Sequence, residues 1–325
     1  MKKSIAFFSC SNGLGHFSRV LKISKYLAND FEITIYCEKF QYDKFKPNQK
    51  AKFIFYTVPN IRWDKALYNN KIDFENYINW CSIYGPESLK YDKVISDNIV
   101  GLLEYRKDII LSGSFLWADV FEHKFGKNTL SDFDNDLLDK FNPLSFTNKY
   151  VEVGKLKEYK NKVQFGWGCD YKPYKEWGEG KYFVLCSPSF DYLPKYERVI
   201  SKFGQGIPFT GNIQRRDFKY DISWDIHSTE NCTFLIRPGV GMLTHCVENY
   251  IPIVALYSNE DSIEIIELAK QVEKLNIGKK INIDDKNLKF KDIFTTNNNT
   301  IYNKVTFEKD GYKYCKLLKK FMIWL

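Results

Sequence analysis

The sequence lacks the long apolar runs and the closely spaced cysteines that mark several protein classes. No apolar stretch approaches the roughly 18 residues that a membrane-spanning helix needs, and the longest runs are those at 251–257 and 321–325. The eight cysteines include no CxxC pair, and several lie in apolar, strand-like runs. We therefore expect a cytoplasmic protein with reduced cysteines, without a disulfide framework or a zinc site.

Histidine is scarce, and arginine is missing from one end of the chain. There are only four histidines, and the residues from Lys279 onward include no arginine, although the whole chain carries a net charge of +8. A nucleic-acid-binding protein usually carries arginines within a basic stripe, so we expect no nucleic-acid partner. A lysine-rich end suits either a solvated face or an anionic membrane surface.

What is present indicates two α/β domains. The 325 residues are 44% hydrophobic and 17% aromatic, which is enough to bury a large core. Short apolar runs alternate with helical patterns from residue 4 onward, and the alternation begins again at residue 182 after a segment rich in Tyr, Lys and Gly. This pattern is typical of βαβ units on parallel sheets. It predicts one domain over 1–160 and a second over 178–308.

The last segment, 309–325, is predicted to form an amphipathic helix. Leu317, Leu318 and Phe321 recur at helical spacing, whereas Lys316 and Lys320 lie off that stripe. Two interpretations remain: the stripe packs against the protein, or the helix contacts an anionic membrane surface.

A first glycine-rich turn joins a predicted strand at 4–9 to a predicted helix. Gly13 and Gly15 allow a tight turn that a ligand can approach closely, and a helix start offers N–H groups to an anion. His16 lies on this turn, where a neutral imidazole can take a proton from a hydroxyl. The third glycine of a dinucleotide fingerprint and the lysine of a P-loop are both missing. A plain turn that closes a βα unit is the alternative.

Asp97 follows a short apolar strand predicted at 93–96, at the edge where α/β sheets collect catalytic groups. It is predicted to be either a second candidate base or a residue that orients His16. Capping a helix that begins near Ile99 is the alternative.

Three acids at 132, 134 and 136 imitate the DxD motif of metal-dependent glycosyltransferases. They follow a polar run instead of a buried strand. We therefore interpret them as a solvated helix start with Ser131 or Asp132 as its N-cap, and expect no metal site.

A second glycine-rich turn, with Arg237, Gly239 and Gly241, again separates a predicted strand from a predicted helix. Its backbone N–H groups could bind a diphosphate at the carboxyl end of the sheet. Two such turns, one in each domain, predict a ligand cleft between the domains.

Together the two turns resemble the GT-B glycosyltransferases of family 28, related to the peptidoglycan N-acetylglucosaminyltransferase. The resemblance rests on residues 13–16 with Arg19, on Arg237-Pro238-Gly239-x-Gly241, and on Ile251-Pro252. It implies two Rossmann-like domains with a cleft between them and a C-terminal helix that packs back on the first domain. It also implies an N-terminal acceptor domain, a C-terminal domain for a nucleotide-sugar that is commonly UDP-linked, and inverting transfer that needs no metal or other cofactor.

The resemblance also implies roles for individual residues. Gly13, Gly15 and His16 would face the acceptor and the donor phosphates. The nucleotide would be held by Arg237, Gly239, Gly241, Met242 and Leu243, and the donor sugar by Asn259, Asp261 and Glu264. The sequence departs from the family at two places: His245 stands where a glutamate usually grips the ribose, and Ser187 with Ser189 replaces a Gly-Gly-Ser phosphate loop.

We therefore predict a hexosyl- or N-acetylhexosaminyl-type glycosyltransferase of polysaccharide biosynthesis. Its acceptor would be a hydroxyl of a bacterial-type surface glycan or glycolipid, reached at the inner face of the membrane. His16 or Asp97 would be the base, and the acceptor would stack on Trp63, Phe115 and Trp117. The alternatives are a nucleotide-sugar hydrolase or epimerase on the same fold, and a catalytically silent sugar-nucleotide binding protein.

Overall fold

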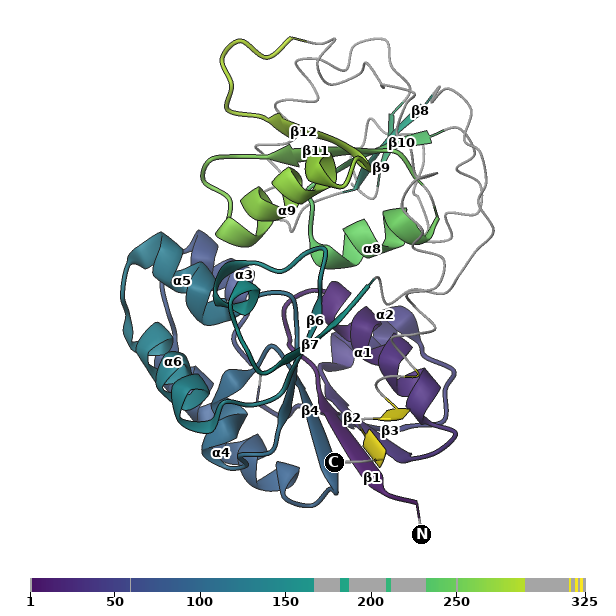
Figure 1. Ribbon diagram of the computed structural model, residues 1–325, viewed down its shortest axis with the longest axis vertical. Coiled ribbons are helices and arrows are strands. Elements are labelled where there is room, and N and C mark those ends of the chain that lie inside the picture. Colours follow the sequence, from purple (N-terminus) through teal and green to yellow (C-terminus); the bar gives the residue numbers. More distant parts are fainter. Residues whose placement is uncertain are drawn as a thin grey trace. The chain divides into compact units, whose positions relative to one another are not determined.

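The chain divides into two compact units in the computed structural model (Figure 1). Unit 1 comprises Met1–Cys169 with Lys309–Leu325, and unit 2 comprises Asp170–Glu308. The described residues are 2–58, 60–166, 182–186, 209–211, 232–249, 251–289, 316, 319–320 and 322–323. Ser187 and Ser189, whose hydroxyls could hydrogen-bond a phosphate or simply form a turn, lie outside these ranges.

Unit 1 is built on a seven-stranded parallel sheet with the strand order β3-β2-β1-β4-β5-β6-β7. The strands are β1 (Ser4–Phe8), β2 (Glu32–Cys37), β3 (Lys52–Phe55), β4 (Lys93–Asp97), β5 (Ile110–Ser112), β6 (Ser145–Asn148) and β7 (Lys162–Phe165). The chain builds outward from β1 to β3 and then crosses back to place β4 on the other side of β1. The order thus reverses between β1 and β4, which is where sheets of this kind bind ligands, at the carboxyl ends of the strands.

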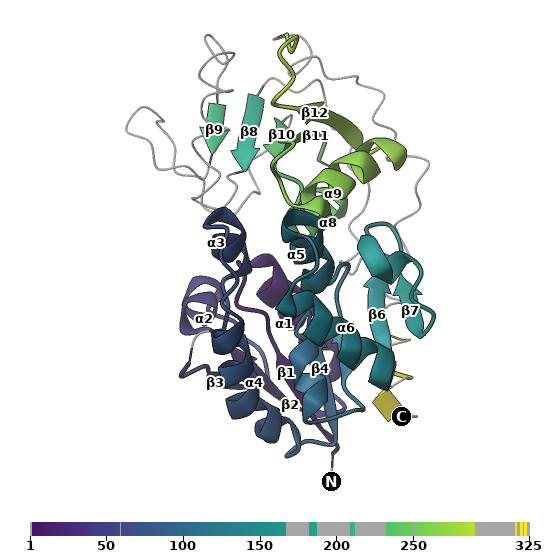
Figure 2. The same ribbon diagram turned by 90° about the vertical axis from the view of Figure 1, so that its left-hand side faces the viewer.

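Helices cover both faces of this sheet (Figures 1 and 2). They are α1 (Gly15–Leu27), α2 (Lys39–Phe45), α3 (Trp63–Tyr68), α4 (Phe74–Ser88), α5 (Trp117–Phe125) and α6 (Thr129–Phe141). Alternate side chains of β1 point to opposite faces. Phe7 packs in the cluster that includes Phe17 of α1, whereas Phe8 stacks on Tyr36 and meets Trp80 of α4 edge-on. Burial on both faces explains the continuous apolar sequence of β1.

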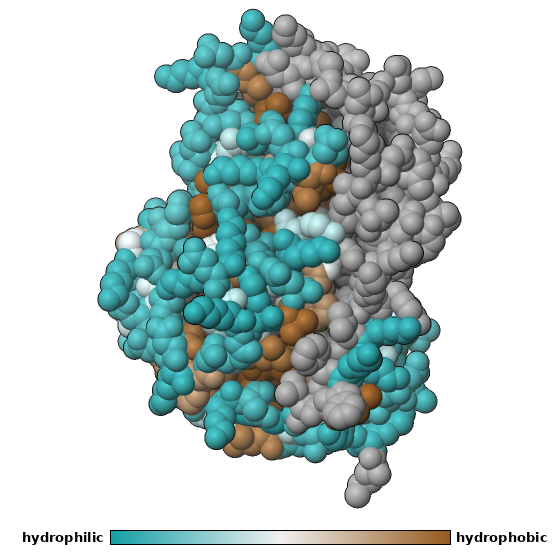
Figure 3. All heavy atoms as spheres, in the orientation of Figure 1, coloured by the Kyte–Doolittle hydropathy of each residue, from teal (hydrophilic) through white to brown (hydrophobic). Residues whose placement is uncertain are grey.

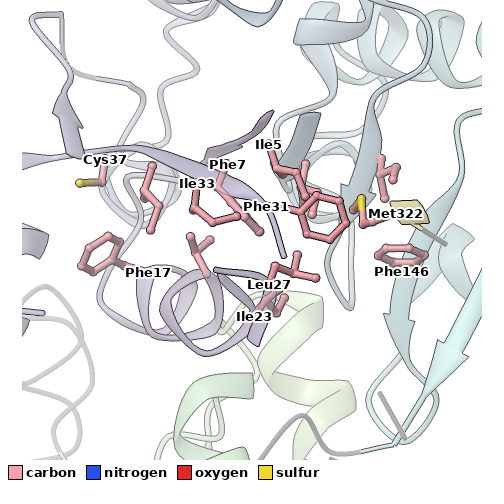
Figure 4. Close-up of a cluster of buried hydrophobic side chains, with 14 of the residues drawn as sticks. Ile5, Phe7, Phe17, Ile23, Leu27, Phe31, Ile33, Cys37, Phe146 and Met322 are labelled. Carbon is pink, nitrogen blue, oxygen red and sulfur yellow. The ribbon is translucent and has the colours of Figure 1, made fainter. Parts of the chain in front are cut away.

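The C-terminal segment contributes to the core of unit 1 (Figure 4). Met322 is fully buried in the same cluster as Ile5, Phe31 and Phe146. Lys319 forms an ion pair with Asp30, at 2.8 Å between Nζ and Oδ2. The predicted packing of this segment against the first domain is therefore confirmed at Met322.

Unit 2 has a five-stranded parallel sheet in the order β12-β11-β10-β8-β9. Its described elements are β8 (Tyr182–Cys186), β9 (Phe209–Gly211), β10 (Cys232–Ile236), α8 (Val240–Glu248), β11 (Ile253–Tyr257), α9 (Ile263–Lys274) and β12 (Gly278–Asn282). Apolar residues at helical spacing bury one side of α9, including Leu268 and Val272. Hydrophilic side chains dominate the visible outer surface of α6 and α9 (Figure 3). Both units are thus Rossmann-like, as the sequence predicts.

None of the helices in the described ranges combines the length and the apolar character needed to cross a membrane.

The acidic run at 132–136 differs from its predicted structure. The N-cap of α6 is Asn128, whose side chain accepts a 3.0 Å hydrogen bond from the backbone N–H of Ser131. Asp134 is 1% exposed, not solvated, and its Oδ1 accepts a hydrogen bond from the Tyr77 hydroxyl at 3.1 Å. The reason is the helical period, which turns Asp134 toward the core while Asp136 faces solvent. Burial raises the pKa of Asp134 to about 7.

We expect the Asp134→Asn variant to be more stable than the wild type at pH 8. The unfolded carboxyl ionises near pH 4, so the wild type loses stability as the pH rises from there through the raised pKa of about 7. An asparagine oxygen can still accept the Tyr77 hydrogen bond without this penalty. The gain in unfolding free energy should be larger at pH 8 than at pH 5 by on the order of 2 kcal/mol, measured by urea unfolding. Asp136→Asn is the control, and an equal gain at both pH values would contradict the prediction.

Candidate active site

The first glycine-rich turn has a backbone conformation that requires glycine. Gly13 has a φ of +71°, in the left-handed region, and α1 begins two residues later. The fully buried side-chain amide of Gln41 on α2 stabilises the turn by hydrogen bonds to its backbone. Its Nε2 donates to the carbonyl oxygens of Cys10 and Gly13, both at 2.9 Å. No sequence signal pointed to Gln41, because its partners are backbone groups about 30 residues away in the chain.

His16 and Asp97 are hydrogen-bonded to each other. His16 Nδ1 lies 2.9 Å from Asp97 Oδ2, and the side chains are 12% and 1% exposed. An ionised carboxylate only accepts hydrogen bonds, so Nδ1 carries the proton and Nε2 keeps its lone pair. The helix-capping alternative for Asp97 is wrong: the short 3-10 helix Val100–Glu104 follows an N-cap residue, Ile99, without a side-chain cap.

Arg19 is the third member of this group. Its Nε donates to Asp97 Oδ1 at 3.0 Å, and its Nη2 also contacts Oδ1. Burial works against ionisation of Asp97, but the charges of Arg19 and His16 and their hydrogen bonds outweigh it and hold the pKa of Asp97 below its usual range. The carboxylate is therefore ionised at neutral pH. Arg19 lies three residues after His16, on the same face of α1, and this spacing could have identified it.

The aromatic side chains predicted to stack on an acceptor form part of the core instead. Trp63, Phe115 and Trp117 are at most 2% exposed. Trp63 stacks on Trp117 with ring centroids 5.4 Å apart, and the rings of Phe115 and Trp117 each lie 6.2 Å from that of His16. Large aromatic rings lower their free energy most by burial against each other. Of these rings, Phe115 and Trp117 lie beside His16.

In unit 2, the second turn leads into the start of α8. Gly239 is the N-cap residue with an extended φ of −78°, so its backbone conformation does not itself require glycine. A Cβ added there would meet no atom within 4 Å, so the backbone faces open space. The first turn of α8 carries no acidic side chain. Backbone N–H groups at such a helix start favour an anion.

Arg237 is anchored beside this turn by Asp261. Arg237 Nε lies 2.9 Å from Asp261 Oδ1, and the side chains are 10% and 0% exposed. The second oxygen of Asp261 accepts the backbone N–H of Ser258 at 2.7 Å. From the sequence we expect Asp261 beside the donor sugar, and in the structure its carboxylate contacts Arg237. A carboxylate so buried satisfies its charge within the protein, and Asp261 positions Arg237.

The other predicted donor residues lie on α8, on α9 and in the loop after β11. Gly241 and Met242 are partly exposed in the first turn of α8, whereas the side chain of Leu243 is buried. His245 lies further along α8, where its carbonyl oxygen accepts a 2.8 Å hydrogen bond from the Asn249 amide.

Asn259 is exposed after β11, and its side-chain oxygen accepts from Asn282 at 2.9 Å. Glu264 lies half-buried in the first turn of α9. Within the described ranges, no three or more His, Cys, Asp or Glu side chains come together as a set that could hold a metal ion.

Neither protein-family models nor curated protein sequences match this chain. Solved structures do. The glycotransferase of kitacinnamycin has a TM-score of 0.61 at 13% identity, covering 98% of this chain and 95% of its own. LpCGTa in complex with UDP has a TM-score of 0.58 at 11% identity, covering 98% and 94%. The spinosyn rhamnosyltransferase SpnG complexed with thymidine diphosphate has a TM-score of 0.57 at 10% identity, covering 98% and 96%. The chain has the GT-B fold of these glycosyltransferases.

Proposed function

We propose that this protein is a glycosyltransferase that moves a sugar from a nucleotide-sugar to a hydroxyl acceptor. The observation that carries the proposal is the His16–Asp97 pair at the carboxyl edge of the unit 1 sheet, which leaves His16 Nε2 as a proton acceptor. A base of this kind is what a hydroxyl nucleophile needs. The GT-B fold and the two glycine-rich turns support the same reaction class, and the turns favour family 28 within that fold.

The proposed reaction is a single displacement. His16 Nε2 takes the proton of the acceptor hydroxyl, whose oxygen forms a bond to the anomeric carbon. The bond from that carbon to the diphosphate oxygen breaks, and its electron pair leaves with the nucleoside diphosphate. Attack opposite the leaving group inverts the anomeric centre. Asp97 stabilises the imidazolium that forms, and Arg237 with the N–H groups at the start of α8 stabilises the leaving diphosphate without a metal.

For the donor, we propose a UDP-linked hexose or N-acetylhexosamine. LpCGTa was solved with UDP and SpnG with thymidine diphosphate, which supports a pyrimidine nucleoside diphosphate as the ligand class. His245 would then contact the ribose from α8.

For the acceptor, we propose a surface glycan or glycolipid reached from the cytoplasm. Lys320 is exposed and Ile323 is 52% exposed beside the buried Met322, so this edge of the segment can face an anionic membrane.

One assay separates the candidate functions. The protein is incubated with labelled UDP- and TDP-sugars, with and without hydroxyl acceptors, and both nucleotide release and the identity of the labelled sugar product are followed. Acceptor-dependent release supports the transferase. Turnover without acceptor indicates a hydrolase or epimerase, and saturable binding without turnover indicates a silent binding protein.

We expect Arg237→Ala to weaken binding of UDP or thymidine diphosphate by about 2 kcal/mol, or roughly 30-fold in Kd, because a charge-assisted hydrogen bond to the diphosphate is lost. Calorimetry measures the change, and circular dichroism checks the fold, since Asp261 loses its partner. Lys270→Ala, at an exposed pair with Glu267 on α9, is the control and should bind as the wild type does. Unchanged affinity in Arg237→Ala would mean that the turn has only a structural role.

A further inference from the structure

The guanidinium of Arg19 contacts more than a single carboxylate oxygen. Besides Asp97 Oδ1, its Nη2 lies 3.4 Å from the carbonyl oxygen of Ser112 and 3.3 Å from Nδ1 of His16. Nδ1 and the guanidinium are both donors, so the short approach between them is not a hydrogen bond. Both groups converge on Asp97 from the same helix.

We propose that Arg19 is a positioning residue for the base: it fixes the orientation of Asp97 and limits how much of that carboxylate's charge acts on His16. The proposal rests on the proposed function, in which His16 takes the acceptor's proton.

The positioning role follows from the way in which the neighbouring groups divide the two carboxylate oxygens of Asp97 between them. Arg19 engages Oδ1 through two nitrogens and so holds that oxygen in place. Oδ2 is then directed to Nδ1 of His16 at 2.9 Å and receives the backbone N–H of Cys10 at 3.4 Å. The imidazole is thereby held with Nε2 turned away from Asp97. Without Arg19, the carboxylate could rotate and the imidazole with it.

The charge argument follows from burial. Asp97 is 1% exposed, and a buried carboxylate needs a charged partner at all times. Arg19 supplies that charge permanently, whereas His16 becomes charged only when it has taken a proton. Among the described residues, Phe115 and Trp117, whose rings lie beside His16, supply no charge, and burial raises the pKa of the Cys10 thiol, which stays neutral beside Asp97.

Removing Arg19 would shift the pH below which the base is inactive to a higher value. Burial would then raise the pKa of Asp97, since the largest opposing charge is gone. While Asp97 stays ionised, its unshared charge would favour a protonated His16 in the resting enzyme. Protonation of Asp97 and protonation of His16 in the resting enzyme each leave the protein without a working base, and in the variant this happens at a higher pH than in the wild type.

The test compares Arg19→Met, Arg19→Lys and the control Lys25→Met, which removes an exposed charge from the same helix. In Arg19→Met we expect kcat at pH 7 to fall up to about 100-fold, with donor KM within about twofold, because the reacting groups are misplaced. The acid limb of its pH–rate profile should move to higher pH, because burial of Asp97 is no longer opposed by the charge of Arg19. Arg19→Lys should keep the acid limb and lose only part of kcat, because the charge remains without the two-nitrogen grip. An unmoved acid limb in Arg19→Met would overturn the inference.

A second measurement does not depend on activity. The lowered pKa of Asp97 contributes stability that is present above the unfolded pKa and is lost as the pH falls through the folded one. Both test pH values lie above that window, so the wild type keeps this contribution at each of them. In Arg19→Met, burial raises the pKa of Asp97, and the variant loses stability as the pH rises from the unfolded pKa through that raised pKa. Arg19→Met should therefore lower the urea midpoint more at pH 7 than at pH 4.5, and Lys25→Met should show no such difference. If the wild type shows no transferase activity while Arg19→Met still shows this pH-dependent change in urea midpoint, the proposed function is overturned, and Arg19 has no catalytic role. If the wild type is active but Arg19→Met shows no such change, only the inference about Arg19 is overturned.

Discussion

Replacing His16 by alanine is expected to lower kcat by about 100-fold or more while nucleoside diphosphate affinity stays within a few fold. The reason is that Nε2 is the atom that takes the acceptor's proton, and loss of a general base costs about 10²- to 10⁴-fold in rate. In the proposed reaction, Arg237 and the N–H groups at the start of α8 in unit 2 hold the diphosphate, so its binding depends little on the imidazole.

The measurement combines steady-state kinetics with calorimetry on the same preparation. His123→Ala, on α5, removes a histidine without touching the base and is the matched control. Wild-type kcat in His16→Ala would transfer the role of base to Asp97, which the sequence left as the alternative.

The Asp97→Asn variant is expected to lose about 10³-fold in kcat. An asparagine keeps the shape of the side chain, but it cannot stabilise the imidazolium, and the positive charge of Arg19 then stands unbalanced close to His16. The amide can also present its NH₂ group to Nδ1, which would select the tautomer that has its proton on Nε2. Loss of the charge and loss of the tautomer both remove the base.

A double variant tests whether the two side chains act as a unit. If they do, His16→Ala combined with Asp97→Asn should be hardly slower than the worse single variant. Multiplicative losses would show that Asp97 acts independently of His16. Removing one partner of a buried ion pair also lowers stability by about 3 kcal/mol or more, so each variant must first be shown to be folded by circular dichroism. Asp136→Asn, exposed on α6, is the control.

The sequence by itself determined the features that depend on neighbours in the chain. Continuous apolar runs predicted β1 and β10, because strands buried on both faces need no polar alternation. The glycine at position 13 marked a turn, and the structure gives it the positive φ that glycine adopts without strain. The start of α8 was predicted in the same way, from a strand that ends in a Gly-x-Gly turn. Each of these features depends on a few consecutive residues, so a local sequence pattern is enough to predict it.

The tertiary structure alone decided which distant residues meet. Asp97 reaches His16 across 81 residues because the crossover after β3 places β4 beside β1, with Ser96 paired to Phe8. Asp261 reaches Arg237 across 24 residues by the same kind of strand adjacency, since β10 and β11 are neighbours.

The burial of Trp63 and Trp117 likewise follows from their stacking on each other, although α4, β4 and β5 lie between them in the chain. No local pattern encodes strand order. The pairing of the base, the anchoring of Arg237 and the burial of the aromatic rings are therefore properties of the packed sheets and helices, because each depends on the free energy of contacts between segments that the sequence keeps far apart.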